Sequence, residues 1–497
     1  MQEITIDQLQ EMMETGVSSA RTITEQYLAR IEKIDRQGPA LNSIIEINPD
    51  ALAIADSLDK ERTETGPRSP LHGIPILIKD NIDTADQMMT TAGSLALLGS
   101  FAAKDSFVAQ RLRENGAVIL GKTNLSEWAN FRSKKSSSGW SSRGGQTRNP
   151  YALDRNPFGS SAGSGVAVSA SLCAAAVGTE TDGSIIMPSS ACSIVGIKPT
   201  VGLIGRSGII PIAHSQDTPG PMARTVRDAA ILLGGLTGID SKDSASQKNA
   251  GKFFSDYTQF LDAQGMNRAR IGIARNFFGF QVKVDKIFNA AIEKMKQLGA
   301  EIIDPVYINH LPKMKEYELE LMLFEYKNGL NDYLQGRRPA GAVNSLSEVI
   351  AFNENNQDQV MPYFGQDLLL RAEAKGSLRE EPYLRAVEEC HRLSRTEGID
   401  QVLQEQRLDA IAAPSAGPPC LTDLVNGDHF TGSSSRPAAI AGYPNITVPA
   451  GYIFGLPVGI SFFSTAYQEP RLIKLAFAFE QASPVRHPPQ FLASAHL

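Results

Sequence analysis

Serine hydroxyls in two glycine-rich stretches are the groups in this sequence best suited to chemistry. Residues 158–165 read Phe-Gly-Ser-Ser-Ala-Gly-Ser-Gly, and residues 178–188 read Gly-Thr-Glu-Thr-Asp-Gly-Ser-Ile-Ile-Met-Pro. Small side chains let a backbone approach a substrate closely, and glycine permits a positive φ. We therefore expect tight turns with exposed N–H donors, which suit an oxyanion hole. The turns are predicted at Gly159, Gly163, Gly165, Gly178 and Gly183.

A serine nucleophile needs a base within hydrogen-bond reach. None of the seven histidines lies in either glycine-rich stretch. Lys79, however, ends the apolar run 74–78, which should desolvate its ammonium group and lower its pKa from about 10.4 towards neutrality. A neutral lysine can accept a proton. Lys122 and Lys198 also follow apolar runs, and we interpret them as structural or solvent-facing residues, because only Lys79 has the motif context described next.

The two stretches resemble the sequence motifs of the amidase signature family of serine hydrolases. The family's Gly-Gly-Ser-Ser-Gly-Gly-Ser run corresponds to residues 158–164, and its Gly-Thr-Asp-Thr-Gly-Gly-Ser-Ile-Arg run corresponds to residues 178–186. Ser160 and Ser184 stand 24 residues apart, as the family pattern requires. The sequence departs from the family pattern at Phe158, Ala162, Glu180, Asp182 and Ile186.

Within that family, the second motif resembles the peptide amidase branch more than the A subunits of tRNA-dependent amidotransferases. Residues 126–133, Ser-Glu-Trp-Ala-Asn-Phe-Arg-Ser, and residues 215–224, Ser-Gln-Asp-Thr-Pro-Gly-Pro-Met-Ala-Arg, share this resemblance. It is strong over residues 71–230 and returns over residues 413–482. No motif is recognised between those two blocks.

The resemblance implies a catalytic role for three residues. Ser184 corresponds to the nucleophile, Ser160 to a bridging serine that follows a cis peptide bond, and Lys79 to the base. Ser161 corresponds to a serine that supports this relay by hydrogen bonding. The resemblance also implies an oxyanion hole built from the backbone N–H groups of Thr181, Asp182, Gly183 and Ser184.

Two departures from the family pattern affect the site without removing a member of the triad. Asp182 replaces a glycine, so it keeps the N–H group and adds a carboxylate that could hydrogen-bond a substrate N–H or shape the leaving-group side. Ile186 replaces a common arginine, so any ion pair of that arginine must be absent or replaced. Trp128, Phe131 and Trp140 are candidates either for the substrate cleft or for packing.

A Ser-His-Asp enzyme is an alternative interpretation of the same residues. Gly159–Gly163 matches the pattern Gly-x-Ser-x-Gly, with Ser161 as the nucleophile. That pattern belongs on a turn after an apolar strand, and residues 148–157 are not such a strand. The glycine-rich stretch also lacks the Gly-Lys-Ser/Thr and Gly-x-Gly-x-x-Gly patterns of nucleotide sites, and no metal-ligand spacing is visible.

Alternation of helices and strands predicts an α/β fold with a large central mixed sheet covered by helices on both faces. Thr5 and Gln8 suit a capping box, and Asp105 suits the cap of a helix that runs through Leu112. The uncharged run 166–177 is interpreted as a buried helix. Predicted strands are 43–47, 73–80, 116–121, 408–414, 445–449 and 455–463, and a helix, Gly-Ala, strand pattern spans 291–303.

We expect residues 1–497 to form a single domain. Its predicted parts are N-terminal helices over about 1–66, a core with the motifs over 67–236, a variable helical region over 237–408 and a C-terminal return to the sheet over 409–497. The resemblance implies that the variable region shapes substrate entry.

Composition excludes several classes of partner. Hydrophobic residues make up 42% of the chain and charged residues 21%, as in ordinary globular proteins. A formal net charge of −6 provides no electrostatic footprint for nucleic acid or an anionic membrane. The four cysteines show no Cys-x-x-Cys spacing, which favours free thiols in a reducing compartment. The first residues resemble no signal peptide, so we expect a cytoplasmic protein.

These observations together predict an amidohydrolase that uses Ser184, Ser160 and Lys79 without a metal or another cofactor. The branch resemblance implies release of ammonia from C-terminal amides of peptides or from related amides. Three alternatives remain: a general aryl or aliphatic amidase, a glutaminase subunit of a tRNA-dependent amidotransferase, and an inactive binding module. We expect a small-molecule or peptide amide substrate and no obligate protein partner.

Overall fold

The computed structural model describes residues 2–336 and 343–496, and their centre is a large mixed sheet. Within those residues the sheet has eleven strands in the order β1-β3-β2-β6-β8-β7-β12-β13-β11-β9-β10. β2 runs parallel to β3 and β6, β9 runs parallel to β10 and β11, and the other neighbours are antiparallel. The mixed α/β sheet predicted from the sequence is therefore confirmed.

The strands come from both ends of the chain, and all but two of those described join the large sheet; β4 (Trp140–Ser141) and β5 (Gly145–Gln146) form a separate pair. The strands of the large sheet are β1 (Ile44–Ile47), β2 (Pro75–Lys79), β3 (Val118–Thr123), β6 (Ala175–Glu180), β7 (Val195–Lys198), β8 (Thr218–Ala223), β9 (Arg270–Ala274), β10 (Glu301–Val306), β11 (Ala410–Pro414), β12 (Asn445–Ile453) and β13 (Leu456–Phe463). Each strand predicted from the sequence therefore has a counterpart in the sheet.

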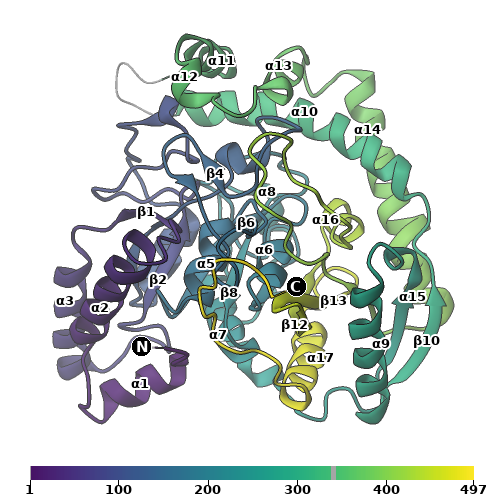
Figure 1. Ribbon diagram of the computed structural model, residues 1–497, viewed down its shortest axis with the longest axis horizontal. Helices are drawn as coiled ribbons and strands as arrows, with labels where there is room; N and C mark the ends of the chain where they lie inside the picture. The colour runs from purple at the N-terminus through teal and green to yellow at the C-terminus, as the bar shows by residue number, and fades with distance from the viewer. Residues whose placement is uncertain (1, 337–342, 497) are drawn as a thin grey trace.

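Helices surround the sheet (Figure 1), with α1, α2 and α3 near β1 and β2 at one end, and α9 and α15 near β10 at the other. They are α1 (Ile6–Glu14), α2 (Ala20–Arg30), α3 (Ala51–Thr65), α4 (Phe107–Glu114), α5 (Ala162–Ser169), α6 (Ile186–Ala191), α7 (Val226–Leu236), α8 (Ser244–Gln247), α9 (Val282–Gln297), α10 (Leu311–Gln335), α11 (Leu346–Asn355), α12 (Gln357–Val360), α13 (Asp367–Glu373), α14 (Glu381–His391), α15 (Asp400–Gln406), α16 (Arg436–Ala441) and α17 (Glu469–Ala482). No helix of the described residues is long and apolar enough to cross a membrane.

Alternate residues of β11 belong to two separate hydrophobic clusters. Ala410 and Ala412 belong to the larger cluster, whereas Ile411 and Ala413 belong to the other. Successive side chains of a strand point to opposite faces of a sheet, so the two clusters lie on opposite faces. The larger cluster includes residues of α1, α2, α5, α7, α9 and α17, and the other includes residues of α10, α11, α13, α14, α15 and α16. Helices therefore cover both faces, as predicted.

The prediction of one buried helix over residues 166–177 is wrong. α5 ends at Ser169, Ser171 has a positive φ of 56°, and β6 begins at Ala175 between β2 and β8. A short uncharged run has no periodicity that separates a buried helix from a buried strand. Residues 175–180 form a strand because the fold places them between β2 and β8, where both neighbours pair with them.

The glycine prediction also needs correction, because of the five glycines only Gly183 has a positive φ. Gly163 and Gly165 lie in α5, and Gly178 lies in β6. A Cβ at Gly163 would lie 2.2 Å from the carbonyl oxygen of Ser43. The helical and strand glycines thus allow close packing of backbones rather than turns.

Of the two helix starts predicted from the sequence, the one at Thr5 is confirmed and the one at Asp105 is wrong. Thr5 and Gln8 form the expected capping box. α4, however, begins after Ser106, whose hydroxyl accepts from the N–H of Ala109, whereas Asp105 pairs with Arg113. The predicted helix, Gly-Ala, strand pattern of residues 291–303 is present as α9 and β10, and the four cysteines are free.

Candidate active site

The side chain of Lys79 lies at the centre of a buried hydrogen-bond cluster. Lys79 is the last residue of β2, a strand that lies between β3 and β6 in the sheet, and it is fully buried. Its Nζ atom lies 2.7 Å from Ser160 Oγ, 3.1 Å from Ser161 Oγ, 2.9 Å from Thr179 Oγ1 and 3.1 Å from the Thr179 carbonyl oxygen. The fold therefore brings Lys79 together with the first serine motif, across 81 positions of sequence.

Burial changes the acid–base chemistry of Lys79. Removal from water lowers the pKa of its ammonium group to about 7, while the negative charges of Asp217 and Glu180 oppose this shift. A substantial fraction of the side chain is therefore neutral at pH 7. A neutral amine next to a hydroxyl can act as a general base.

Ser160 and Ser184 lie on neighbouring loops that meet through the backbone. The Gly159–Ser160 peptide bond is cis, as the resemblance implied, and the N–H of Ser161 donates to the carbonyl oxygen of Ser184 at 3.1 Å. Ser184 and Gly159 line a cavity of about 490 Å³. Within residues 2–336 and 343–496, Ser184 Oγ has no hydrogen-bond partner, so the Ser160–Ser184 contact of a relay is not formed in this state. Catalytic contacts often tighten only when substrate binds.

The turn of residues 181–184 has free backbone donors beside the same cavity, which Thr181, Asp182 and Ser184 line. In the described part of the chain, no protein acceptor bonds to the N–H groups of Thr181, Asp182, Gly183 or Ser184. Gly183 has a φ of 80°, and a Cβ there would lie 2.8 Å from Met187 Sδ and 3.0 Å from Ser435 Oγ. These four N–H groups are thus available to a developing negative charge.

The carboxylate of Glu180 hydrogen-bonds to the backbone that follows Ser184. One of its oxygens accepts from the N–H of Ile185 at 2.7 Å and from that of Ile186 at 2.9 Å, just beyond Ser184. Glu180 is fully buried, and desolvation raises its pKa while the charge of Lys198 lowers it. Lys198 is itself fully buried, so it is a structural lysine rather than a surface one.

Asp182 belongs to a charged cluster on the wall of the cavity. Ser435 Oγ donates to Asp182 Oδ1 at 2.5 Å, and Arg436 lies 3.3 Å from Asp182 Oδ2 and 2.7 Å from Glu318 Oε2. Burial, together with the charge of Asp182, raises the pKa of Glu318 to about 7. Ile186 is fully buried, and Arg436 supplies a cation that pairs with Asp182 in this turn.

Comparison with known proteins identifies the family. The sequence model of the Amidase family matches residues 22–473. The chain belongs to the amidase signature family. It is 42% identical to a probable amidase of Arabidopsis thaliana, over 99% of this chain and 92% of that protein. It is 33% identical to the A subunit of the glutamyl-tRNA(Gln) amidotransferase of Halorhodospira halophila, over 97% of this chain and 98% of that protein.

Solved amidase structures share the whole fold. The peptide amidase PAM in complex with the competitive inhibitor chymostatin is 47% identical, with a TM-score of 0.96, 98% of this chain covered and 99% of that chain. The native peptide amidase from Stenotrophomonas maltophilia is 46% identical, with a TM-score of 0.94 and 99% of each chain covered. The protein is therefore an amide-hydrolysing enzyme.

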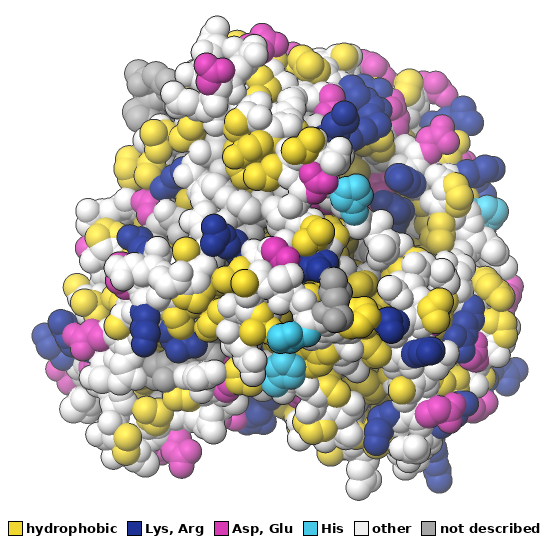
Figure 2. All heavy atoms as spheres, viewed as in Figure 1, with side chains coloured by type: hydrophobic (Ala, Val, Ile, Leu, Met, Phe, Trp, Pro, Cys, Tyr) yellow, Lys and Arg dark blue, Asp and Glu magenta, His cyan; other side chains and the backbone are white. Residues whose placement is uncertain are grey.

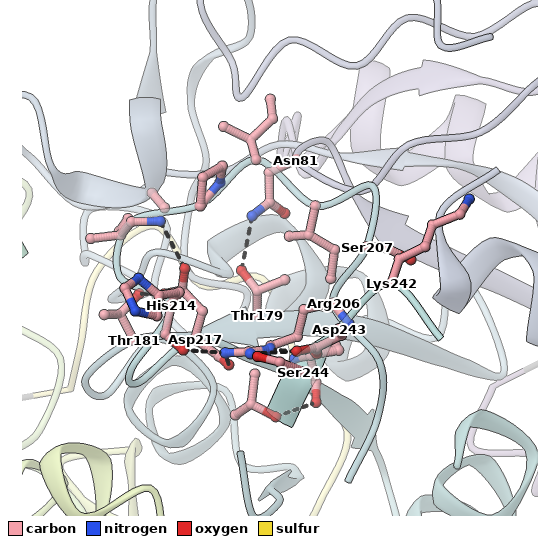
Figure 3. Close-up of a pocket in the computed structure, with 17 residues that line it drawn as sticks. Asn81, Thr179, Thr181, Arg206, Ser207, His214, Asp217, Lys242, Asp243 and Ser244 are labelled. Atoms are coloured by element: carbon pink, nitrogen blue, oxygen red, sulfur yellow. Dashed lines mark hydrogen bonds and ion pairs between the residues drawn. The ribbon is translucent and has the colours of Figure 1, made fainter. Parts of the chain in front are cut away.

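A second cavity of this amidase, of about 330 Å³, lies next to the first and is shown in Figure 3. Thr181 lines both cavities, and Thr179 lines the second. Asn81 Nδ2 donates to Thr179 Oγ1 at 3.1 Å, and Thr181 Oγ1 donates to Asp217 Oδ1 at 2.5 Å. Burial raises the pKa of Asp217 to about 6. The sequence predicts no role for Asn81, Thr179 or Asp217, although Asn81 stands two residues after Lys79.

The remaining candidates of the sequence analysis divide between the amidase cavity and the core. Phe131 lines the cavity with Ser184, whereas Trp128 and Trp140 are buried and are not among its lining residues. Lys122 is fully buried and bonds to the Thr90 hydroxyl and the Ile82 carbonyl, so it is structural. The Ser161 hydroxyl bonds to Lys79 and Thr179, and no histidine is among the described residues that line this cavity, so the geometry favours a lysine base over the Ser-His-Asp interpretation.

Replacing Gly178 with alanine is expected to damage both activity and stability of the amidase. A Cβ on this residue of β6 would lie 2.8 Å from Met222 Sδ and 2.8 Å from Ser161 Oγ. We expect at least a tenfold loss of kcat/KM on an amide substrate, and a loss of about 1–3 kcal/mol in the free energy of unfolding from overpacking. Activity assays and denaturant titration measure the two effects.

Gly365→Ala is the matched control, since its Cβ would meet no atom within 4 Å of the described structure and its φ is not positive. Equal effects of the two substitutions would contradict this account of Gly178.

Proposed function

We propose that this amidase releases ammonia from the C-terminal amides of peptides, with Ser184 as nucleophile, Ser160 as bridging serine and Lys79 as base. One observation carries the mechanism: Nζ of a buried lysine with a pKa of about 7 lies 2.7 Å from Ser160 Oγ, beside the cavity that Ser184 lines. A lysine in its usual, fully charged state could not accept a proton there.

The proposed reaction proceeds through an acyl-enzyme. Lys79 accepts the proton of Ser160, Ser160 accepts that of Ser184, and Ser184 Oγ forms a bond to the amide carbonyl carbon. The N–H groups of Thr181, Asp182, Gly183 and Ser184 stabilise the resulting oxyanion. The C–N bond then breaks as the nitrogen receives the proton back through Ser160, and ammonia leaves. Water attacks the ester by the same relay and frees Ser184.

Ser161 supports the base in this proposal. Its Oγ lies 3.1 Å from Lys79 Nζ and donates to the Thr179 carbonyl oxygen at 3.0 Å, so it limits the positions that the amine can take. The carboxylate of Asp182, oriented by Ser435 and Arg436, accepts a hydrogen bond from a substrate N–H. No cofactor or partner chain takes part, and the four free cysteines suit a reducing compartment such as the cytoplasm.

The substrate class is tested by ammonia release from a panel of peptide amides, free glutamine and benzamide. We expect turnover of peptide amides to exceed that of benzamide and of glutamine. The 47% identity to a peptide amidase over nearly the whole chain supports this expectation. Strong turnover of benzamide with none of any peptide amide would make the protein a general amidase instead.

A glutaminase role is the second candidate, because an amidotransferase A subunit matches over almost the whole chain at 33% identity. The same assay separates the two, since glutamine hydrolysis that appears only when the other amidotransferase chains are added would favour the glutaminase.

A further inference from the structure

The segment before α16 forms one wall of the cavity that Ser184 lines. Phe430, Thr431, Gly432 and Ser433 all line this cavity. The segment pairs with the residues after β11 through an antiparallel bridge between Ala416 and Ser433. It is therefore a short piece of extended chain at the active site.

The register of that bridge decides where the backbone groups of Ser433 point. The N–H of Gly417 donates to the carbonyl oxygen of Gly432 at 3.1 Å, and the N–H of Ser434 donates to that of Ser415 at 3.3 Å. The residues on either side of Ser433 thus make the hydrogen bonds to residues 415–417, and Ala416 and Ser433 form a non-hydrogen-bonded pair. The N–H and C=O groups of Ser433 consequently point away from residues 415–417.

Those two backbone groups have no protein partner in the part of the chain that the structure describes. The same holds there for the N–H and C=O groups of Thr431, one pleat earlier. Ser433 is only partly buried, and it lines the cavity. An unpaired donor and an unpaired acceptor on one extended residue are what a second strand needs in order to pair.

The free edge is joined directly to the catalytic turn. Ser433 Oγ lies 3.1 Å from Ser435 Oγ, which in turn donates to Asp182 Oδ1 at 2.5 Å. Ser433, Asp182 and Ser184 all line the same cavity. A peptide whose terminal carbonyl reaches Ser184 can therefore pass alongside Ser433.

We propose that the peptide amide substrate binds as an added β-strand on the edge 431–433, and that the N–H and C=O groups of Ser433 pair with its main chain. This inference rests on the proposed function. In this mode of binding the enzyme recognises the main chain of the peptide, and the affinity comes from backbone hydrogen bonds that do not depend on the side chains. Specificity for the terminal amide then comes from Ser184 and its turn rather than from side-chain pockets.

The apolar residues beside the edge fit this mode of binding. Phe430 is 48% exposed, and its ring centroid lies 5.2 Å from that of Phe158. Because side chains of a strand alternate between faces, one substrate side chain in two would lie on this side of the edge. We expect a mild preference for an apolar residue at one position and indifference at its neighbour.

An ester scan of the substrate tests the proposal on the wild-type enzyme. The parent is acetyl-Ala-Ala-Phe-NH2, and each backbone N–H in turn is replaced by an ester oxygen, with ammonia release as the readout. Loss of one hydrogen bond at a partly buried site typically lowers binding affinity by up to about tenfold, and the acceptor that is left unpaired lowers it further. We expect one analogue to lose about tenfold or more in kcat/KM, chiefly through KM, and at least one other to stay within about twofold.

The enzyme side is tested by Ser433→Pro, which removes the N–H group, beside Ser433→Ala, which keeps it and removes only the hydroxyl. Both variants lack the hydroxyl, so the loss of the N–H group is read from the difference between them. On the parent peptide Ser433→Pro should be about tenfold less active than Ser433→Ala, whereas on benzamide the two variants should agree within about twofold. If Ser433→Pro does not fold, the ester scan is repeated on Asp182→Ala, because the Asp182 carboxylate is the other acceptor proposed for a substrate N–H. An N–H whose replacement still costs about tenfold in that variant supports the edge, and the absence of any such N–H overturns it.

Two negative results have different meanings. Absence of turnover for every peptide amide would overturn the proposed function, and the edge proposal with it. Good turnover of the parent, with all ester analogues within about twofold of it, would overturn the edge proposal and leave the proposed function intact.

Discussion

Replacing Ser184 with alanine is expected to lower kcat for a peptide amide by about 10⁵-fold or more, to near the uncatalysed level. Removal of the nucleophile of a serine hydrolase typically costs on the order of 10⁶-fold, because the acyl-enzyme can no longer form. The oxyanion donors of the 181–184 turn stay in place, so substrate should still bind with a Kd close to the wild-type value. Ammonia release and equilibrium binding of a peptide amide measure the two quantities.

Ser189→Ala is the matched control for this change. Ser189 lies in α6, five residues after Ser184, and its buried Oγ has no hydrogen-bond partner among the described residues. Its removal should leave kcat within about threefold of wild type. Retention of peptide amidase activity by Ser184→Ala would show that another residue forms the covalent bond, and the relay proposed here would be wrong.

Replacing Lys79 with alanine is expected to lower kcat/KM by about 10³–10⁴-fold and to remove the acidic limb of the pH profile. The wild-type profile should fall tenfold per pH unit below about pH 7, because burial lowers the pKa of Lys79 to about 7 and the protonated amine cannot accept a proton. Above that pH the amine is neutral and the rate should level off. Ammonia release at pH 5 to 9 measures the profile, with the fold verified by thermal denaturation.

Glu318 must be separated from Lys79 in this experiment, since the pKa of Glu318 is also raised to about 7 and the residue lines the cavity. Glu318→Gln should keep the acidic limb, whereas Lys79→Ala should lose it. A second control, Lys104→Ala, changes an exposed lysine and should behave as wild type. Activity of Lys79→Ala that still rises through pH 7 would assign the base to another group.

The face of the molecule in Figure 2 gives little reason to expect a partner that binds to it by electrostatics. Figure 2 shows basic and acidic side chains interspersed over the face that it presents, without a broad patch of one sign. The edge at Ser433 is a different kind of surface, since it offers backbone donors and acceptors rather than charge. Substrate binding at this edge should therefore depend only weakly on ionic strength.

Much of the fold follows from local pattern. The apolar run that ends at Lys79, the strand at 456–463 and the capping box at Thr5 are each specified by residues within a few positions, and each is present. The family motifs likewise single out Ser160, Ser184 and Lys79 from spacing and residue type. A buried lysine at the end of a strand also predicts a lowered pKa, which the structure supports.

The sequence by itself therefore determined the family, the class of fold and the residues that could do chemistry. Only the tertiary structure decided that Lys79 lies 2.7 Å from Ser160 and that residues 175–180 form a strand. It also decided that Arg436 and Glu318 meet Asp182. These features depend on contacts between segments up to hundreds of residues apart, which local propensity does not encode. The free edge at Ser433 also depends on the tertiary structure, because the pairing with residues 415–417 determines which backbone groups of Ser433 stay unpaired.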